Sequence, residues 1–286
     1  MSSEERYIGL DLGGTAVKAG LVSAGVVIRN ASVPLKPSGS FDEIMAQICQ
    51  LIDSLEPGGV SGIGVGAPSV VNVVEGIVYD TQNIPSWREV DVPLGPVLKQ
   101  KFRIPAYVNN DANCFVLGEK YFGKAKGYSN VVGVTIGTGL GSGLIIDNRL
   151  YSGTNCGAGE FGMVPFRDRV IEYYASGQFF TSVYGIRGEV LAKRAEQGEE
   201  QARAIFSEFG RNLGEAVKTI LYAVDPELII LGGSVSRSFP LYEQAMRETL
   251  ETFVYPRSLR RLRIEISELP NAAILGAASL CLEFGK

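Results

Sequence analysis

The same local pattern occurs twice in this chain and constrains the fold more than any other feature. Residues 7–22, YIGLDLGGTAVKAGLV, and residues 130–150, NVVGVTIGTGLGSGLIIDNRL, each join apolar runs of strand character through turns rich in Gly and Thr. Each stretch predicts an antiparallel β-meander, and helical and strand patterns follow both. The period is too long for a solenoid. The sequence therefore predicts an α/β protein of two packed lobes, each a sheet with flanking helices, with a cleft between them.

The spacing of apolar residues predicts the elements that follow each meander. Residues 41–55, for example, place Ile44, Ile48 and Ile52 on one helical face. Further helices are expected over residues 94–102, 111–123, 201–224, 241–253 and 272–284. Further strands are expected over residues 26–33, 62–68, 105–109, 227–235 and 262–267.

Composition narrows the function classes. The net charge of −4 over 286 residues argues against a general affinity for nucleic acid or anionic membranes. No apolar run approaches the roughly 20 residues of a membrane span, and the acidic start MSSEERYIGL is unlike a signal peptide. The four cysteines are far apart, so we expect reduced thiols in a cytoplasmic protein. His is absent, so acid–base chemistry must fall to Asp, Glu, Lys, Tyr or Cys.

Three Gly-rich turns follow strand-like runs: DLGGT (11–15), GTGLGSG (137–143) and LGGSV (231–235). Glycine lets a ligand approach backbone N–H groups, and successive N–H groups form anion-binding concavities. Thr15 and Thr138 add hydroxyl donors. One such turn is most simply a tight hairpin, but three favour a polyphosphate held between the lobes. None has the Gly-Lys-Ser/Thr of a P-loop or the GxGxxG pattern of a dinucleotide-binding fold.

A carboxylate stands beside the first of these turns. Asp11 would repel a phosphate unless a cation lay between them, and Mg²⁺ binds carboxylates, waters and phosphate oxygens. We therefore expect Asp11 to hold the Mg²⁺ of Mg·ATP, directly or through water. The alternative is that Asp11 only accepts hydrogen bonds from the N–H groups of its own turn.

A second polar cluster lies in YVNNDAN, residues 107–113. One of its Asn or Asp residues is expected to cap the following helix, but three such side chains exceed what one cap requires. Without His, Asp111 is the candidate general base that accepts the proton of an attacking hydroxyl. Glu160 in GAGEFG and Glu172 in IEYYASG add carboxylates, although each by itself is compatible with a solvated charge.

In order and spacing, these motifs resemble the ROK family of glucokinases, fructokinases, N-acylhexosamine kinases and related repressors. The matching stretches are GLDLGGTAVKAGLV, GIGVGAP, NIPSW, VNNDAN, GTGLGSGLI, GAGEFG and VDPELIILGGSVS, and they span nearly the whole chain. The resemblance implies a two-lobed actin/hexokinase-like (ribonuclease H-like) fold. Residues 1–110 and 272–286 would form the N-terminal lobe, and residues 111–271 the C-terminal lobe.

The resemblance also implies roles for individual residues. ATP would lie between the lobes, and Asp111 would be the catalytic base. The residues expected to contact the sugar are Gly66, Asn83, Asn110, Asp111, Glu160 and Glu172. Those expected to bind Mg·ATP are Asp11, Gly13, Gly14, Thr15, Lys18, Gly137, Thr138, Gly139, Gly232 and Gly233, with Asp11 linked to Mg²⁺.

One segment departs from the family pattern. Where the family has a sugar-contacting His, this chain has Met163, and no Cys-rich zinc-binding segment follows. We therefore expect no structural zinc. Packing by Met163, Phe166, Tyr173 and Tyr174 is expected to order this loop instead.

The sequence thus predicts an ATP-dependent hexose kinase of glucokinase type. Fructose, an N-acylated hexosamine or allose remain alternative acceptors, and polyphosphate an alternative donor. A non-catalytic sugar or nucleotide sensor of the same fold is the alternative from another class. The chain begins directly at the first strand, which favours the kinases over the repressors, and the resemblance implies a homodimer.

Overall fold

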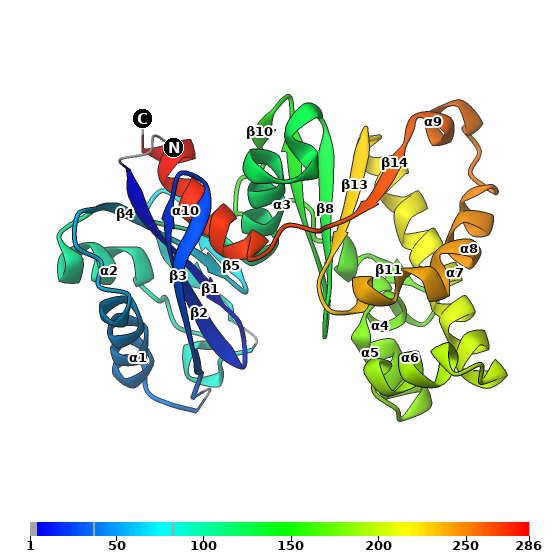
Figure 1. Cartoon of the computed structure of the whole chain (residues 1–286), viewed down its shortest axis with the longest axis horizontal. Coiled ribbons are helices and arrows are strands. Elements are labelled where there is room, and N and C mark those ends of the chain that lie inside the picture. Colours follow the sequence, from blue (N-terminus) through cyan, green and yellow to red (C-terminus); the bar gives the residue numbers. More distant parts are fainter. Residues whose placement is uncertain (1–4, 37, 82, 286) are drawn as a thin grey trace.

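The computed structural model describes residues 5–36, 38–81 and 83–285. Two lobes lie side by side, each built around a five-stranded β-sheet with helices packed against it (Figure 1). This arrangement confirms the α/β, two-lobed fold class expected from the sequence. Within the described residues, no helix combines the length and the hydrophobicity needed to cross a lipid bilayer.

The first sheet combines an antiparallel meander with two parallel strands. In spatial order its strands are β3 (Val26–Pro34), β2 (Ala16–Ser23), β1 (Arg6–Leu12), β4 (Val60–Ala67) and β7 (Ala106–Asn110). β1, β2 and β3 pair antiparallel, whereas β4 and β7 run parallel to β1. Parallel neighbours need a crossover, which α1 (Phe41–Ser54) and α2 (Leu94–Phe102) supply. The chain between β4 and α2 forms a hairpin of β5 (Val70–Asn72) and β6 (Ile77–Tyr79), and the short helix η1 (Pro85–Trp87).

Helix α1 shows how the sequence sets the limits of an element. The Ser40 hydroxyl accepts a hydrogen bond from the Glu43 N–H at 3.2 Å, and the Glu43 carboxylate accepts one from the Ser40 N–H at 2.8 Å. This reciprocal pair is a capping box, which satisfies backbone donors at the helix start. Ile44, Ile48 and Ile52 are buried in the core of the lobe. The helix predicted over residues 41–55 is therefore confirmed to within one residue.

The second sheet repeats the plan of the first, strand for strand. In spatial order its strands are β10 (Arg149–Leu150), β9 (Leu140–Ile146), β8 (Val131–Ile136), β13 (Leu228–Gly232) and β14 (Arg263–Ile266). β8, β9 and β10 form the antiparallel meander, and β13 and β14 continue parallel to β8. The two meanders that the sequence predicts therefore occupy equivalent places in the two lobes.

Most of the remaining helices belong to the second half of the chain. They are α3 (Asp111–Phe122), α4 (Ile171–Ala175), α5 (Gly177–Tyr184), α6 (Gly188–Glu196), α7 (Glu200–Val224), α8 (Phe239–Leu250), α9 (Pro256–Arg261) and α10 (Ala272–Phe284). Short 3-10 helices are η2 (Lys124–Gly127), η3 (Phe161–Met163) and η4 (Val235–Ser238). Aromatic rings hold several of these helices together: Phe180 of α5 lies 5.1 Å from Phe209 of α7, and Phe209 meets Tyr242 of α8 edge to face at 5.0 Å.

Helices α3 and α10 connect the lobes. α10 packs on β1 and β4 of the first sheet and on α3, while α3 packs on β8 and β9 of the second. Glycine permits this close approach. A Cβ on Gly276 of α10 would overlap the carbonyl oxygen of Cys114, and one on Gly64 of β4 would overlap that of Ala277. The backbones of the two helices and the first sheet are therefore in direct contact.

We propose the same lobe boundaries that the sequence suggests. Residues 1–110 and 272–286 would form one lobe and residues 111–271 the other. The chain ends of this assignment, residues 1–4 and 286, lie outside the described residues. The proposal is supported by the two separate sheets and by α10, which packs on the first of them.

Candidate active site

Three parallel strands bring distant polar residues to one edge of the first sheet. Asp11 near the end of β1 pairs with Gly66 of β4, and Gly66 pairs with Asn109 of β7. Helix α3 begins two residues later, at Asp111. Gly66 allows this approach, since a Cβ there would already lie 3.3 Å from the Cα of Asp111. Carboxyl ends of parallel strands form a frequent ligand-binding edge in α/β folds.

The three consecutive polar residues at the start of α3 have different tasks. Asn110 is the helix cap, because its side-chain oxygen accepts hydrogen bonds from the N–H groups of Ala112 at 2.9 Å and Asn113 at 3.4 Å. Asn109 is fully buried, and its oxygen accepts from the Asn110 N–H at 2.8 Å and from the Asn113 amide at 2.9 Å. The cap is therefore accounted for without Asp111.

Asp111 has an unusual electrostatic environment. Burial raises the pKa of its carboxyl to about 7, and the nearby charges of Asp11 and Glu160 act in the same direction. The Ala112 N–H, which donates to Asp111 Oδ1 at 2.8 Å, opposes this shift. A carboxyl with a pKa near neutrality is suited to accept a proton and release it again.

Asp11 is close enough to Asp111 to raise its pKa, and the Lys18 ammonium lies near Asp11. The Lys18 ammonium is 3.7 Å from Asp11 Oδ2 across the β1–β2 pair, and it lowers the pKa of Asp11. Burial has the larger effect, so the pKa of Asp11 is raised from its ordinary value. Two neighbouring carboxyl groups, each with a pKa raised by burial, are a donor set to which an additional cation would be attracted.

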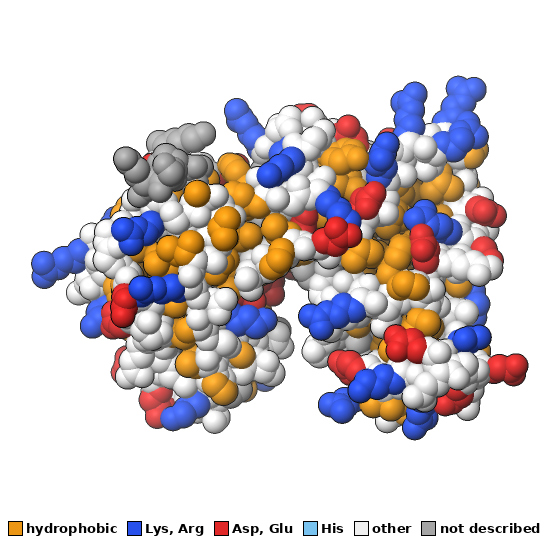
Figure 2. Space-filling view, viewed as in Figure 1, with side chains coloured by type: hydrophobic (Ala, Val, Ile, Leu, Met, Phe, Trp, Pro, Cys, Tyr) orange, Lys and Arg blue, Asp and Glu red, His pale blue; other side chains and the backbone are white. Residues whose placement is uncertain are grey.

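A cleft of about 660 Å³ lies between the lobes, in line with the hollow visible in Figure 2. The predicted site residues that line this cleft are Asn83, Asn110, Asp111, Gly137, Thr138, Gly139, Glu160, Glu172 and Gly233. Further lining residues, to which no sequence motif pointed, include Ser69, Val70, Asp80 and Thr135. The cleft therefore collects predicted residues from both halves of the chain.

The glycine turn at residues 137–141 is held in place by Glu172. Glu172 Oε2 accepts a hydrogen bond from the Leu140 N–H at 2.8 Å, and Oε1 accepts one from the Gln178 side chain at 2.9 Å. A Cβ on Gly139 would overlap Glu172 Oε2. Each carboxylate oxygen keeps a second lone pair for a ligand. Partial desolvation and the charge of Glu172 raise the pKa of Glu160.

The other glycine turns differ in how they meet the cleft. In the β1–β2 turn, which holds Gly13, Gly14 and Thr15, a Cβ on Gly14 would lie 2.8 Å from the Cβ of Asn83, so this turn adjoins the cleft wall. In the turn after β13, Gly233 lines the cleft, whereas Gly232 is buried against the ring of Phe115. Of Gly232 and Gly233, only Gly233 therefore lines the cleft.

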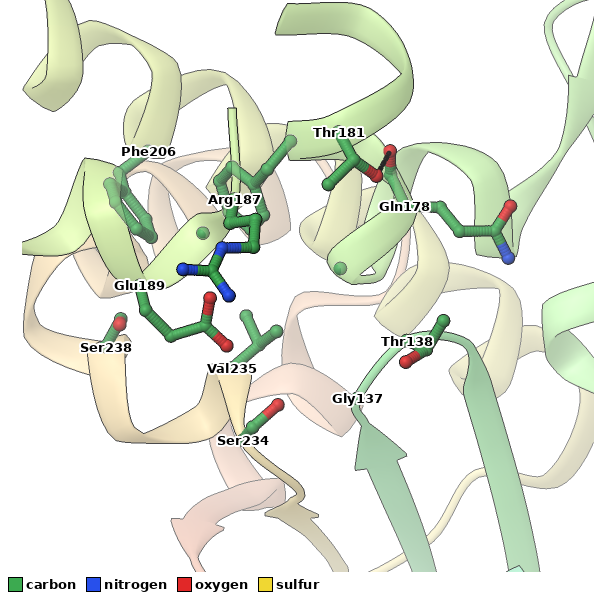
Figure 3. Close-up of a pocket in the computed structure, with 13 residues that line it drawn as sticks. Gly137, Thr138, Gln178, Thr181, Arg187, Glu189, Phe206, Ser234, Val235 and Ser238 are labelled. Atoms are coloured by element: carbon green, nitrogen blue, oxygen red, sulfur yellow. Dashed lines mark hydrogen bonds between the residues drawn. The ribbon is translucent and has the colours of Figure 1, made fainter. Parts of the chain in front are cut away.

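A second pocket of about 200 Å³ opens beside the same glycine turn (Figure 3). Gly137 and Thr138 line both this pocket and the cleft. Its other walls come from α5, α6, α7 and the η4 segment, and include Gln178, Thr181, Arg187, Glu189, Ser234 and Val235. Ser234 and Val235 belong to the LGGSV motif, but no sequence signal pointed to Gln178, Arg187 or Glu189.

The segment after Glu160 differs in part from its prediction. Phe166, Tyr173 and Tyr174 do pack together, with ring centroids 5.6 and 5.0 Å apart. Met163 does not join them: its residue is half exposed and lines the cleft. Among the residues that the structure describes, no three Cys, Asp or Glu side chains are grouped to hold a metal ion.

Comparison with known proteins identifies the lineage. The ROK family model matches residues 7–283. The chain belongs to the ROK family. Its two-lobed fold is also that of a solved ROK glucokinase from Streptomyces griseus in complex with glucose and AMPPNP. That structure superposes with a TM-score of 0.83 at 28% identity, covering 96% of this chain and 98% of the other.

ROK relatives of this chain include both kinases and repressors. An N-acetyl-D-glucosamine kinase from Pectobacterium atrosepticum is 30% identical over 294 residues, which cover 93% of this chain and 92% of the kinase. A xylose repressor from Caldicellulosiruptor bescii is 28% identical over 312 residues, which cover 96% of this chain and 77% of the repressor. Family membership alone therefore does not distinguish a kinase from a repressor, and the residues of the site have to be considered as well.

Proposed function

We propose that this ROK protein is an ATP-dependent sugar kinase that phosphorylates a hydroxyl of a hexose, with glucose as the first candidate. One observation carries the proposal: Asp111, a buried carboxyl with a pKa of about 7, faces a cleft of about 660 Å³ that also holds the 137–141 glycine turn. Clefts of this size suit small-molecule substrates. The similarity to an N-acetyl-D-glucosamine kinase and to a glucokinase bound to glucose and AMPPNP supports it.

In the proposed reaction, Asp111 accepts the proton of the acceptor hydroxyl. The hydroxyl oxygen then forms a bond to the γ-phosphorus of ATP. The bond between that phosphorus and the β–γ bridging oxygen breaks, and its electron pair leaves with ADP. The backbone N–H groups of the glycine turns stabilise charge on the transferred phosphoryl group. Asn110 and Asn109 hold the start of α3, and with it the base, in position.

The acidic pair fits a divalent cation. Asp11 offers carboxylate oxygens, and its raised pKa shows that Lys18 alone does not compensate its burial. We propose that Asp11 holds Mg²⁺ bound to the nucleotide, directly or through water. When bound, Mg²⁺ supplies positive charge that offsets the negative charge of the phosphates.

The second pocket supports a nucleotide donor over bare polyphosphate. It shares Gly137 and Thr138 with the cleft, so phosphates at this turn can continue into it. Its walls combine apolar Val235 and Phe180 with polar Gln178 and Arg187, a mixture that suits a nucleoside.

Met163 favours a second candidate acceptor. The half-exposed residue lines the cleft together with Glu160 and Glu172. A thioether makes favourable contact with apolar groups and is at best a weak hydrogen-bond acceptor. An N-acylated hexosamine, whose acyl methyl group would pack on Met163, is therefore the alternative acceptor.

A sugar panel tests the proposal. ADP release would be followed with glucose, fructose, allose, N-acetylglucosamine and N-acetylmannosamine, with ATP or polyphosphate as donor. We expect turnover with at least one hexose and ATP, and its loss in Asp111→Asn. If no sugar raises turnover above the ATPase background while sugars still bind, the protein is a sensor, as its similarity to a xylose repressor would allow. The homodimer and the cytoplasmic location stay predictions.

A further inference from the structure

The segment that carries both glutamates has little regular structure of its own. Strands β11 (Pro165–Phe166) and β12 (Arg169–Val170), each only two residues long, form a hairpin. The five-residue helix α4 follows directly. Glu160 precedes the hairpin, and Glu172 lies in the first turn of α4. Such short elements are marginal by themselves. Side-chain contacts must therefore fix the segment.

Arg167, an exposed residue at the tip of the hairpin, makes several of these contacts. Its guanidinium carbon lies 5.1 Å from the centroid of the Phe166 ring and 4.9 Å from that of the Tyr174 ring. The two rings meet edge to face at 5.6 Å. A cation within about 6 Å of aromatic rings is attracted by their quadrupoles. Arg167 therefore joins the hairpin to α4.

Asn212 extends this connection to the long helix α7. Its side-chain oxygen accepts a hydrogen bond from Arg167 at 2.9 Å, and its amide donates to the Tyr174 carbonyl at 3.2 Å. Only 1% of Asn212 is exposed, so loss of either partner would leave a buried polar group unsatisfied. We name Phe166, Arg167, Tyr174 and Asn212 the Arg167 clamp.

Helix α4 carries one residue of the clamp and one residue of the cleft. Tyr174 is held by the clamp, and Glu172, two residues earlier, holds the Leu140 N–H and lines the cleft. α4 is too short to bend independently of its ends, so a shift of Tyr174 would move Glu172. Glu172 packs so closely on Gly139 that a Cβ there would overlap its carboxylate, so even a small shift of Glu172 would change this contact.

We infer that Arg167 is a positioning residue for acceptor binding: through Tyr174 and Asn212 it holds α4 so that Glu172 faces the cleft and supports the 137–141 turn. The inference rests on the proposed sugar-kinase function. Arg167 itself is absent from the cleft lining, and its effect would pass through Glu172.

Arg169 provides a matched control. It is also a cation on an aromatic ring in the same hairpin, with its guanidinium carbon 5.5 Å from the Tyr173 centroid. The experiment compares Arg167→Met, Arg167→Lys and Arg169→Met with the unchanged protein. We would measure kcat, the KM for sugar and for ATP, direct sugar binding by calorimetry, and amide hydrogen exchange at Leu140.

We expect Arg167→Met to raise the KM and Kd for sugar about tenfold, corresponding to about 1.4 kcal/mol. Leu140 should exchange at least about tenfold faster, because its N–H donates to Glu172. The KM for ATP should rise by less than the KM for sugar, because Glu172 also supports the 137–141 turn at which the phosphates are proposed to bind. Arg167→Lys keeps the positive charge but loses the planar guanidinium, so its sugar affinity and Leu140 exchange rate should lie between those of Arg167→Met and the unchanged protein. Arg169→Met should match the unchanged protein in both measurements.

Two results would overturn the inference. One is an Arg167→Met protein with unchanged sugar affinity and a protected Leu140 amide. The other is a lower melting temperature with unchanged sugar affinity, which is the signature of a purely structural contact. If Arg167→Met fails to fold, Arg167→Lys and Asn212→Ala carry the same comparison. If the unchanged protein phosphorylates no sugar, the proposed function fails, while the Leu140 exchange rates still decide whether the clamp positions Glu172.

Discussion

Asp11 raises the pKa of Asp111 at the carboxyl ends of the parallel strands of the first sheet. Burial is the larger cause, but the contribution of Asp11 shows that two carboxyl groups far apart in the sequence belong to one site. The path between them is short in space, because Asp11 pairs with Gly66 and Gly66 with Asn109. The sheet thus holds near Asp11 a carboxyl group whose pKa lies close to neutrality.

Replacing Asp111 by Asn should have opposite effects on activity and stability. Turnover should fall by roughly 10²- to 10⁴-fold, the usual contribution of a general base. The folded-state pKa of about 7 lies above the ordinary value of 3.8, so the stability that protonated Asp111 contributes is lost as pH rises through that range. Asn stays neutral, so the free energy of unfolding of Asp111→Asn should exceed that of the unchanged protein by roughly 1–3 kcal/mol at pH 8. Below pH 4 this difference should disappear, because Asp111 is then protonated in both the folded and the unfolded protein. Denaturant titration at both pH values checks this; unchanged turnover would remove Asp111 from the base role.

The activity itself should depend on pH near neutrality. The base acts when deprotonated, so kcat/KM should rise with pH and level off above an apparent pKa of about 7. Carboxyl carbon NMR of the free protein should give a matching titration for Asp111. In Asp11→Asn the midpoint of the Asp111 NMR titration should move to lower pH, because a negatively charged neighbour of Asp111 has been removed. A midpoint near 4 in the unchanged protein would contradict the burial and proximity seen here.

Gly139→Ala should disturb acceptor binding through Glu172. The new methyl group would overlap Glu172 Oε2, so the carboxylate must leave the Leu140 N–H. We expect sugar affinity, measured without nucleotide, to fall about tenfold, and the fold to lose roughly 1–3 kcal/mol. Gly137→Ala is the control, since a Cβ there meets nothing within 4 Å. Equal effects of the two substitutions on sugar affinity would argue against the role of Glu172.

Gly276→Ala should destabilise the whole chain. The methyl group would meet the carbonyl oxygen of Cys114 in α3, and backbone on both sides leaves little room to yield. We expect a loss of about 3 kcal/mol or more, or failure to fold. Gly58→Ala, where a Cβ has open space, should be neutral or slightly stabilising. Melting temperatures of the two variants test this, and a Gly276→Ala protein as stable as its control would mean that α3 and α10 separate easily.

Sequence patterns predicted the scaffold well because the scaffold follows local periodicity. The helix over 201–224 and the strand over 105–109 appear as α7 and β7 with ends shifted by one residue. The two meanders were visible because Gly turns interrupt apolar runs. Helices α4, α5 and α6 were not assigned, since residues 171–196 are short amphipathic pieces whose ends depend on tertiary contacts.

The sequence predicted several of the residues that line the cleft, but not the structural role of each. Asn110 and Asp111 were found together, yet only three-dimensional hydrogen bonds show that Asn110 caps α3. The pair Gly232 and Gly233 is symmetrical in sequence, but the Phe115 ring closes one of them off. Arg167 and Asn212 carry no motif, because their meeting depends on how the hairpin folds over α7.

The packing of α10 on the first sheet has a consequence for how the protein is made. Strands β1 and β4 leave the ribosome early, but α10, the helix that covers Gly9 and Gly64, is translated only after the strands and helices of the second sheet. Until then the face of that sheet on which α10 packs lacks this cover, so the nascent protein is exposed to aggregation or chaperone capture there. The lobe that is synthesised first is thus the one completed last.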